Sequence, residues 1–289
     1  MDFLSPTTWG DALQVKAQHP DAVAICGGTD VMVEVNFDHR RPDVLLDLTR
    51  IRELREWGPD DGRTRLGSAV TYTTIIDELA MTLPGLAIAS RTVGSPQIRN
   101  RGTIGGNLGA ASPAGDSHPV LLATDTIIEV ESVRGVRQIP IEAFYTGVKR
   151  HALEPDELIK AIRTTPATGP QQFCKIGTRN AMVISVASFG FALHTDTRTV
   201  GTGIGSAAPT PLRAVDAGRF LADALEDLDL WDSCGELPTE VATEFGEQVK
   251  AAAAPIDDVR GTATYRLHAL SVMARRAATW AWDDYRRAA

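Results

Sequence analysis

The stretch Thr103-Ile104-Gly105-Gly106-Asn107-Leu108 decides the fold of this chain, and Asp116 follows it at a short distance. A second glycine pair stands earlier, in Ala24-Ile25-Cys26-Gly27-Gly28-Thr29-Asp30-Val31. Adjacent glycines let a ligand approach the backbone, and successive backbone N–H groups form a concave surface that suits a phosphate. Neither stretch contains Lys or Arg. We therefore expect a dinucleotide to be held by backbone amides, helped by the side chains of Thr29, Thr103 and Asn107.

A single glycine pair is more often an ordinary turn, so the first stretch alone would be weak evidence for a ligand site. The second stretch is more specific, because Thr precedes the glycines, Asn follows them, and Asp116 is well placed to accept hydrogen bonds from ribose hydroxyls.

Composition excludes several classes of protein. The chain has 289 residues, of which 43% are hydrophobic and 23% are charged, as in ordinary globular proteins. Its formal net charge of −8 argues against general nucleic-acid binding, which needs a basic surface. No apolar run reaches membrane-spanning length, and the start of the chain lacks the pattern of a secretory signal. We therefore expect a cytoplasmic protein with no membrane span.

The cysteines are few and far apart, at Cys26, Cys174 and Cys234. They form no C-x-x-C pair, so we expect neither a disulfide framework nor an iron–sulfur site in this chain. No group of residues has the spacing of a metal site.

Hydrophobic patterning predicts alternating helices and strands over two regions, which indicates an α+β architecture. A hairpin is expected over residues 127–139, with its turn near Arg134-Gly135. Helices are expected over residues 239–254 and 263–287. The segment 164–170 is rich in Pro, Gly and Thr and is the best domain boundary.

Two further features have plainer interpretations. Gly201-Thr202-Gly203-Ile204-Gly205 does not match the dinucleotide pattern G-x-G-x-x-G, so we interpret it as a glycine-rich strand packed closely against another element. His118 follows Asp116, and a structural role for it is favoured over a place in the site.

Together these motifs resemble the FAD-binding medium subunit of the molybdenum hydroxylases, the xanthine dehydrogenase and carbon monoxide dehydrogenase family. The resemblance covers nearly the whole chain in order. Besides the two glycine stretches it is carried by residues 98–102, 112–120, 173–179, 205–214 and 258–266. One departure is Val183-Ile184, where the family often has Asp-Ile, which leaves the role of that position open.

The resemblance implies a fold and a set of FAD contacts. Residues 1–168 would form an FAD-binding domain of the vanillyl-alcohol oxidase (PCMH) type with two small subdomains, and residues 171–289 a small C-terminal α+β domain. Asp116 would bind the ribose or adenosine portion of FAD, and Lys175 would lie near the flavin end, where a positive charge stabilises reduced flavin. The positions matching FAD contacts are Ala24, Ile25, Cys26, Gly27, Gly28, Thr29, Asp30, Val31, Val93, Thr103, Ile104, Gly105, Gly106, Asn107, Asp116, Ile159 and Lys175.

The resemblance also implies a function within a complex of three subunits. A large subunit would carry the molybdenum cofactor and a small one two [2Fe–2S] clusters, from which electrons reach this FAD and then an acceptor such as NAD. A xanthine or hypoxanthine dehydrogenase is our first expectation. Another N-heterocycle, an aldehyde or carbon monoxide is an open alternative substrate, and a self-contained flavin reductase is an alternative function. A scaffold subunit without cofactor is disfavoured by the intact glycine stretches.

Overall fold

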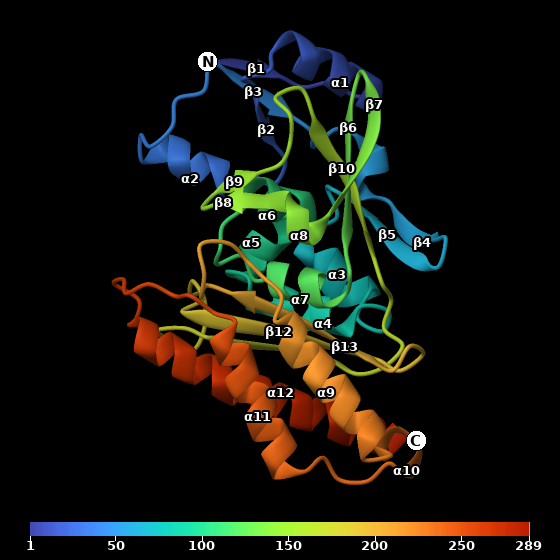
Figure 1. The fold of residues 1–289 in the computed structure, drawn as a ribbon. Coiled ribbons are helices and arrows are strands. Elements are labelled where there is room, and N and C mark those ends of the chain that lie inside the picture. The colour runs from blue at the N-terminus through green and yellow to red at the C-terminus, as the bar shows by residue number, and fades with distance from the viewer. Residues whose placement is uncertain (289) are drawn as a thin grey trace. The chain divides into compact units, whose positions relative to one another are not determined.

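The computed structural model describes residues 1–288 and divides into two compact units, each of which mixes helices and strands (Figure 1). Unit 1 comprises Met1–Ile75, Gly94–Ser112 and Thr126–Thr165. Unit 2 comprises Ile76–Val93, Pro113–Asp125 and Pro166–Ala289. The chain therefore passes from one unit to the other several times. The expected α+β class is confirmed.

Unit 1 contains a three-stranded parallel sheet in the order β1-β3-β2 and a five-stranded antiparallel sheet in the order β4-β5-β10-β6-β7. A two-stranded ribbon, β8-β9, completes its strands. The strands are β1 (Asp2–Leu4), β2 (Val23–Ile25), β3 (Val44–Asp47), β4 (Trp57–Asp60), β5 (Arg63–Gly67), β6 (Ile127–Ser132), β7 (Gly135–Pro140), β8 (Tyr145–Gly147), β9 (Arg150–His151) and β10 (Leu158–Thr164).

The helices of unit 1 are short. They are α1 (Trp9–Gln18), α2 (Val31–Asn36), the 3-10 helix η1 (Arg52–Arg55), α5 (Pro96–Arg101), α6 (Ile104–Ala110) and α8 (Ile141–Phe144), while α3 (Tyr72–Glu78) crosses the division between the units. Trp9, Leu13, Leu46, Leu54 and other apolar side chains form one core around α1 and the three-stranded sheet. In β6 buried and partly exposed residues alternate, as expected for a strand with one covered face. The predicted hairpin is confirmed by the pairing of β6 with β7.

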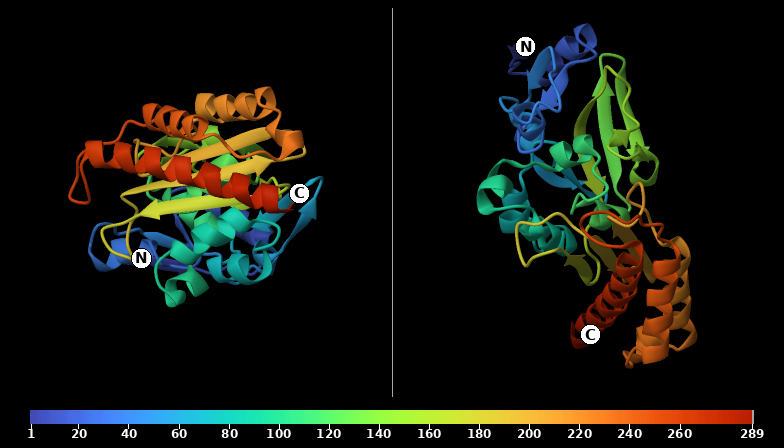
Figure 2. Two further views of the ribbon diagram at one scale, coloured as in Figure 1. Left: turned by 90° about the horizontal axis from the view of Figure 1, so that it is seen from below. Right: turned by 90° about the vertical axis from the view of Figure 1, so that its left-hand side faces the viewer.

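Unit 2 is built on a three-stranded antiparallel sheet in the order β11-β12-β13, comprising Gln171–Ile176, Ala187–His194 and Thr199–Gly205. Helices α9 (Val215–Asp227) and α12 (Ala263–Ala288) pack on one face of the sheet, and α11 (Thr239–Ala251) packs on both of them (Figure 2). Helices α4 (Pro84–Thr92) and α7 (His118–Ala123) cover the other face, and α10 (Leu230–Ser233) follows α9. The two predicted C-terminal helices are confirmed as α11 and α12.

All eight residues of β12 are buried, because helices cover both faces of its sheet. On the α7 side the approach is so close that glycine is required. A Cβ on Gly203 would lie 2.0 Å from the carbonyl oxygen of Pro119, and one on Gly201 would lie 1.8 Å from that of Ala123. The interpretation of residues 201–205 as a closely packed strand is therefore confirmed. His118 is fully buried at the start of α7, and burial lowers its pKa to about 3.

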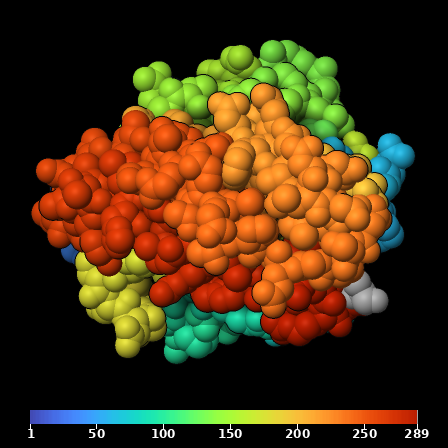
Figure 3. Space-filling view, turned by 60° about the horizontal axis from the view of Figure 1, so that its bottom comes forward, coloured from blue at the N-terminus to red at the C-terminus, as the bar shows by residue number. Residues whose placement is uncertain are grey.

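The exposed surface of α9, α10 and α11 is strongly acidic. Residues 215–250 contain ten acidic and two basic residues, and the whole chain has a formal net charge of −8. All ten acidic residues are exposed, and Figure 3 shows this segment in orange at the front of the view. Asp223, Asp227, Asp229, Glu240 and Glu244 form no ion pair with any residue that the structure describes. This segment alone accounts for the net charge of the protein.

Candidate functional site

The first glycine stretch connects β2 to α2 in unit 1. Gly28 has a φ of +75°, which lies in the left-handed region that favours glycine. Gly27 is required for a different reason, because a Cβ there would lie 1.9 Å from the carbonyl oxygen of Arg101, just ahead of the second stretch. The first stretch therefore lies against the segment that leads into the second one, within unit 1.

The second glycine stretch is not an open loop but the first turns of helix α6. Thr103 caps this helix, and its hydroxyl accepts a hydrogen bond of 3.0 Å from the N–H of Gly106. Burial raises the pKa of the Cys26 thiol in the first stretch. A Cβ on Gly105 would lie 2.4 Å from that of Ser68, whereas Gly106 is exposed.

The backbone N–H groups of the two stretches differ in whether they already have a hydrogen-bond acceptor. Ile104 N and Gly105 N donate to the carbonyl oxygens of Val70 and Ser68, at 3.1 and 2.9 Å, and Asn107 N donates to that of Thr103. The expectation that both stretches offer free amides is therefore wrong for the second one, because its amides complete the turn into α6. In the first stretch no acceptor among residues 1–288 takes a hydrogen bond from the N–H groups of residues 27–31.

In unit 2, Asp116 and Lys175 form a buried ion pair. Lys175 Nζ lies 2.5 Å from Asp116 Oδ2, and the two side chains are 9% and 7% exposed. The hydroxyl of Thr92 donates to the same Oδ2 at 2.9 Å, and Lys175 Nζ also donates to the Thr92 carbonyl oxygen at 3.3 Å. Burial raises the pKa of the Asp116 carboxyl, while Lys175 and Thr92 act in the opposite direction.

This ion pair brings together two residues that the resemblance assigns to different portions of FAD. Asp116 was expected at the ribose or adenosine portion of FAD, and Lys175 near the flavin end. Atoms 2.5 Å apart cannot serve opposite ends of an extended dinucleotide. Oδ1 of Asp116 is buried and has no hydrogen-bond partner among the described residues, so it is available as an acceptor.

The remaining predicted contacts are divided between the two units. Ala24 and Ile25 form the end of β2, and Val31 begins α2. Val93 directly follows α4, next to Thr92. Ile159 is 8% exposed in β10, where the pairing with β6 shifts register. Thr92 was missed by the sequence analysis, because a threonine near a helix end carries no signal of what its hydroxyl will meet.

Other kinds of site find no support in the described part of the chain. No group of three or more His, Cys, Asp or Glu residues among residues 1–288 is arranged to hold a metal ion. The three cysteines are free thiols, as predicted. None of the helices within residues 1–288 combines the length and the apolar character that crossing a membrane requires.

The residues present fit a dinucleotide in each unit considered by itself. In unit 1 the free amides of residues 27–31 suit a pyrophosphate, and the exposed Gly106 leaves the backbone open to close approach. In unit 2 the Oδ1 atom of Asp116, which has no partner among the described residues, can accept a hydrogen bond from an N–H or O–H group. It lies beside the Lys175 ammonium, which can donate one. FAD carries two phosphates, hydroxyl groups and a flavin N–H, and so has a group for each of these features.

Comparison with known proteins gives matches along nearly the whole chain. Residues 1–166 match the family described as the FAD binding domain in molybdopterin dehydrogenase, and residues 172–281 the CO dehydrogenase flavoprotein C-terminal domain. The xanthine dehydrogenase FAD-binding subunit of Escherichia coli O157:H7 is 32% identical, over 95% of this chain and 94% of its own. The nicotinate dehydrogenase FAD-subunit of Eubacterium barkeri is 35% identical, over 70% of this chain and 71% of its own. In a solved structure of reconstituted CO dehydrogenase from Oligotropha carboxidovorans, one chain superposes with a TM-score of 0.88 at 27% identity, covering 98% of each chain.

Proposed function

Because this chain belongs to the family of FAD-binding subunits of molybdopterin dehydrogenases, as its motifs predicted, we propose that it is the electron-transfer subunit of a molybdenum hydroxylase. In this proposal it receives electrons from the [2Fe–2S] clusters of a small partner subunit and delivers them to an acceptor such as NAD. A large partner subunit holds the molybdenum cofactor. The run of free amides over residues 27–31 is the observation that carries the proposal.

We assign the FAD pyrophosphate to unit 1. The N–H groups of Gly27 and Gly28 would donate to phosphate oxygens, with help from the side chains of Thr29 and Asn107. The exposed Gly106 would let the phosphates approach the backbone at the start of α6. Bound FAD supplies the redox chemistry, and the chain supplies position and electrostatics.

We assign Asp116 and Lys175 together to the pyrimidine edge of the flavin. This edge presents an N–H donor between two carbonyl acceptors. Asp116 Oδ1 would accept from the N–H, and the Lys175 ammonium would donate to a neighbouring carbonyl. Thr92 holds the carboxylate in place through its hydroxyl. The positive charge of Lys175 at this edge would also stabilise the electron-rich reduced flavin.

The other positions that match FAD contacts, including Val93 and Ile159, complete the proposed site. We retain the division of the sequence into an FAD-binding part, 1–168, and a C-terminal part, 171–289, together with a cytoplasmic location. Xanthine or hypoxanthine is the first substrate to test, supported by the match to a xanthine dehydrogenase subunit. Nicotinate and related N-heterocycles are the second, because the nicotinate dehydrogenase subunit is 35% identical over its matched region.

The test is purification of the tagged chain from its native host, followed by an absorption spectrum, analysis of FAD, iron and molybdenum, and mass analysis of the partners. We expect FAD with one large and one small partner subunit. Reduction of the complex by xanthine, with nicotinate in a parallel assay, then identifies the substrate. FAD on a lone chain that reduces an acceptor by itself would instead establish the self-contained flavin reductase. A colourless chain would refute both.

The assignment of Asp116 has its own test. Asp116→Asn removes the negative charge but keeps an acceptor oxygen, whereas Asp116→Leu removes the acceptor. If the flavin edge binds here, both variants shift the flavin absorption spectrum and redox potential, and Leu weakens FAD binding more. If the ribose binds here instead, affinity falls while the spectrum and potential of the bound flavin stay unchanged.

A further inference from the structure

The three parallel strands of unit 1 end at one edge of their sheet, and this edge carries a fixed negative charge. Strand β2 leads from it into the first glycine stretch, and β3 ends there in Asp47, which is 8% exposed. The Asp47 carboxylate accepts hydrogen bonds from the hydroxyl of Ser5 at 2.8 Å and from the N–H of Thr49 at 2.9 Å. Burial acts to raise the pKa of this carboxyl, but these hydrogen bonds and the charge of Arg101 lower it. Asp47 is therefore ionised beside the proposed pyrophosphate site.

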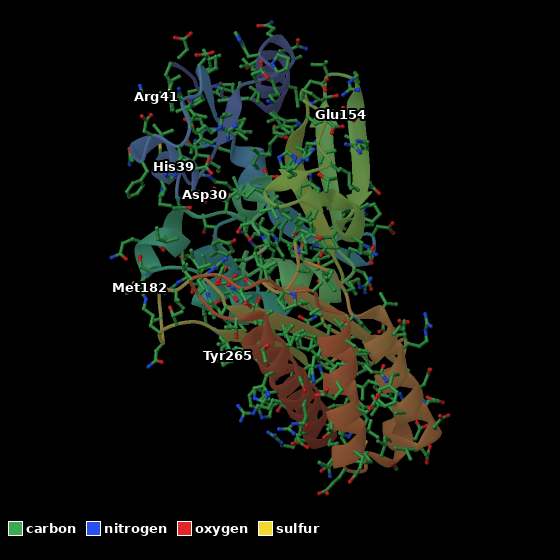
Figure 4. The ribbon with its side chains drawn as sticks, turned by 60° about the vertical axis from the view of Figure 1, so that its left-hand side comes forward. Asp30, His39, Arg41, Glu154, Met182 and Tyr265 are labelled. Atoms are coloured by element: carbon green, nitrogen blue, oxygen red, sulfur yellow. The ribbon has the colours of Figure 1, made fainter. Side chains whose placement is uncertain are left out.

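A second carboxylate lies in the run of free amides itself. Asp30 is exposed, and Figure 4 labels it where the blue part of unit 1 meets the teal helix α5. Each phosphate of a pyrophosphate also carries a negative charge. Backbone N–H groups offer only partial positive charges, so residues 27–31 by themselves would bring like charges together. A cation from outside the two glycine stretches is needed to offset this repulsion.

Arg101, the last residue of α5, lies against the first glycine stretch. Its carbonyl oxygen occupies the space that a Cβ on Gly27 would need. Its side chain is exposed and forms neither an ion pair nor a hydrogen bond with any residue between 1 and 288. The guanidinium group therefore keeps all of its N–H donors beside the first of the free amides.

Arg55, in the 3-10 helix η1, is a second cation at the same edge of the sheet. One of its terminal nitrogens donates to the carbonyl oxygen of Thr49 at 2.8 Å, which leaves its other donors available. Burial raises the pKa of the Cys26 thiol, while the positive charges of Arg55 and Arg101 act to lower it. Because Cys26 directly precedes Gly27, both guanidinium groups act electrostatically on the start of the run of free amides.

We propose that Arg55 and Arg101 supply the positive charge that holds the FAD pyrophosphate against residues 27–31, an inference that rests on the proposed function. The amides fix the phosphate oxygens through hydrogen bonds, and the two guanidinium groups offset the negative charges of the phosphates and of Asp47. Arginine suits this role because its planar group presents several N–H donors to phosphate oxygens at once.

The test measures the Kd for FAD of the full chain with its partners, after removal of FAD, in Arg55→Gln, Arg101→Gln and their double variant. Riboflavin, which lacks the phosphates, is the second probe. Because charge-assisted hydrogen bonds to phosphate are lost, we expect the Kd for FAD to rise about threefold in each single variant and at least about tenfold in the double variant. The Kd for riboflavin stays at the wild-type value. Raising NaCl from about 0.05 to 0.5 M should weaken FAD binding by wild type more than by the double variant.

Two further variants serve as controls. Arg52→Gln removes the same charge from an exposed position in the same 3-10 helix and should bind FAD like wild type. Arg101→Lys keeps the charge but loses the planar group, so it should bind FAD more tightly than Arg101→Gln.

Three results would overturn the proposal. If the double variant binds FAD as tightly as wild type at both salt concentrations, the two arginines do not meet the phosphates, and the proposed function stands. If Arg52→Gln weakens FAD binding as much as the other variants, only the net charge of the chain matters. If the Kd values for FAD and riboflavin rise by the same factor, the arginines support the fold and not the phosphates. A wild-type chain that binds no FAD would reject the proposed function instead.

Discussion

Glycines in the two stretches serve different purposes, although the sequence shows them as equivalent pairs. Gly27 and Gly105 are required because backbone atoms of Arg101 and Ser68 occupy the space of a side chain. Gly106 has only the hydroxyl of Thr103 nearby, at 3.0 Å, and otherwise faces outward. Gly27 and Gly105 are therefore required by the packing of the fold, whereas Gly106 is the glycine that a ligand would need.

We predict opposite behaviour for Gly27→Ala and Gly106→Ala. The first should destabilise the chain by about 3 kcal/mol or more, because overpacking against backbone cannot relax easily. The second should leave the free energy of unfolding unchanged or slightly higher, because Ala favours a helix over Gly by about 1 kcal/mol, yet should lower FAD affinity. Urea unfolding and FAD titration measure the two effects. Gly109→Ala, in the same helix and with nothing within 4 Å, is the control: it should change stability in the same direction and keep FAD affinity. Equal FAD binding by Gly106→Ala and wild type would contradict the assignment.

His118 predicts how stability depends on pH. Its pKa falls from 6.5 to about 3 because the fully buried ring is kept neutral in the folded state. As pH falls below 6.5, the unfolded chain therefore binds a proton at this residue that the folded chain does not bind. The free energy of unfolding decreases as a result. Between pH 7.5 and 5 the loss from this residue is about 2 kcal/mol, at about 1.4 kcal/mol for each pH unit.

The measurement is urea unfolding of wild type and His118→Asn at several pH values between 7.5 and 5. The variant should lose about 2 kcal/mol less than wild type on acidification, whatever its stability at neutral pH. Parallel slopes for wild type and His118→Asn would show that the imidazole titrates normally.

Among the elements, the strongly patterned ones could be predicted from sequence and the glycine-rich ones could not. The β6–β7 hairpin and helix α12 show clear periodicity of two and of about three and a half residues. Adjacent glycines disfavour a helix, so the sequence of α6 carries no helical signal. It forms nonetheless, because Thr103 caps it and Val70 and Ser68 accept from its first amides. These acceptors lie far earlier in the sequence, so local propensity gives no information about them.

The site follows the same rule. The glycine stretches and Asp116 could be located from residue types alone. The ion pair between Asp116 and Lys175, with Thr92 bound to the same oxygen, depends on three separate elements meeting in unit 2. No periodicity in the sequence encodes such a meeting.

The contact between β13 and α7 gives a prediction of its own. Gly203→Ala would place a Cβ 2.0 Å from the Pro119 carbonyl oxygen, so the sheet and α7 would have to separate. We expect a loss of about 3 kcal/mol and a Tm lower by several degrees. Gly58→Ala, in strand β4 with nothing within 4 Å, is the matched strand control and should leave Tm unchanged. Calorimetry of both variants decides whether the close approach is obligatory.

Taken over the full chain, the charge is unevenly distributed, with the acidic helices of unit 2 carrying all of the excess. Like charges on neighbouring helices repel, and salt screens this repulsion. We therefore expect Tm to rise between about 0.05 and 0.5 M NaCl, where the Debye length shortens from about 14 to 4 Å. Replacing Asp223, Asp227, Asp229, Glu240 and Glu244 by their amides should remove most of this rise without changing FAD content. An undiminished rise in the variant would place the repulsion elsewhere.

The passage of the chain between its units has a consequence for how it is made. Helices α4 and α7 leave the ribosome early, but the sheet that covers them consists of strands from the second half of the chain. Until β13 has been synthesised, their apolar faces have nothing to pack on, and a nascent chain in that condition is prone to aggregate. We therefore expect newly made chain to need chaperone protection late into translation. FAD must then bind after the chain is complete, because Asp116 and Lys175 form their ion pair only once unit 2 has folded.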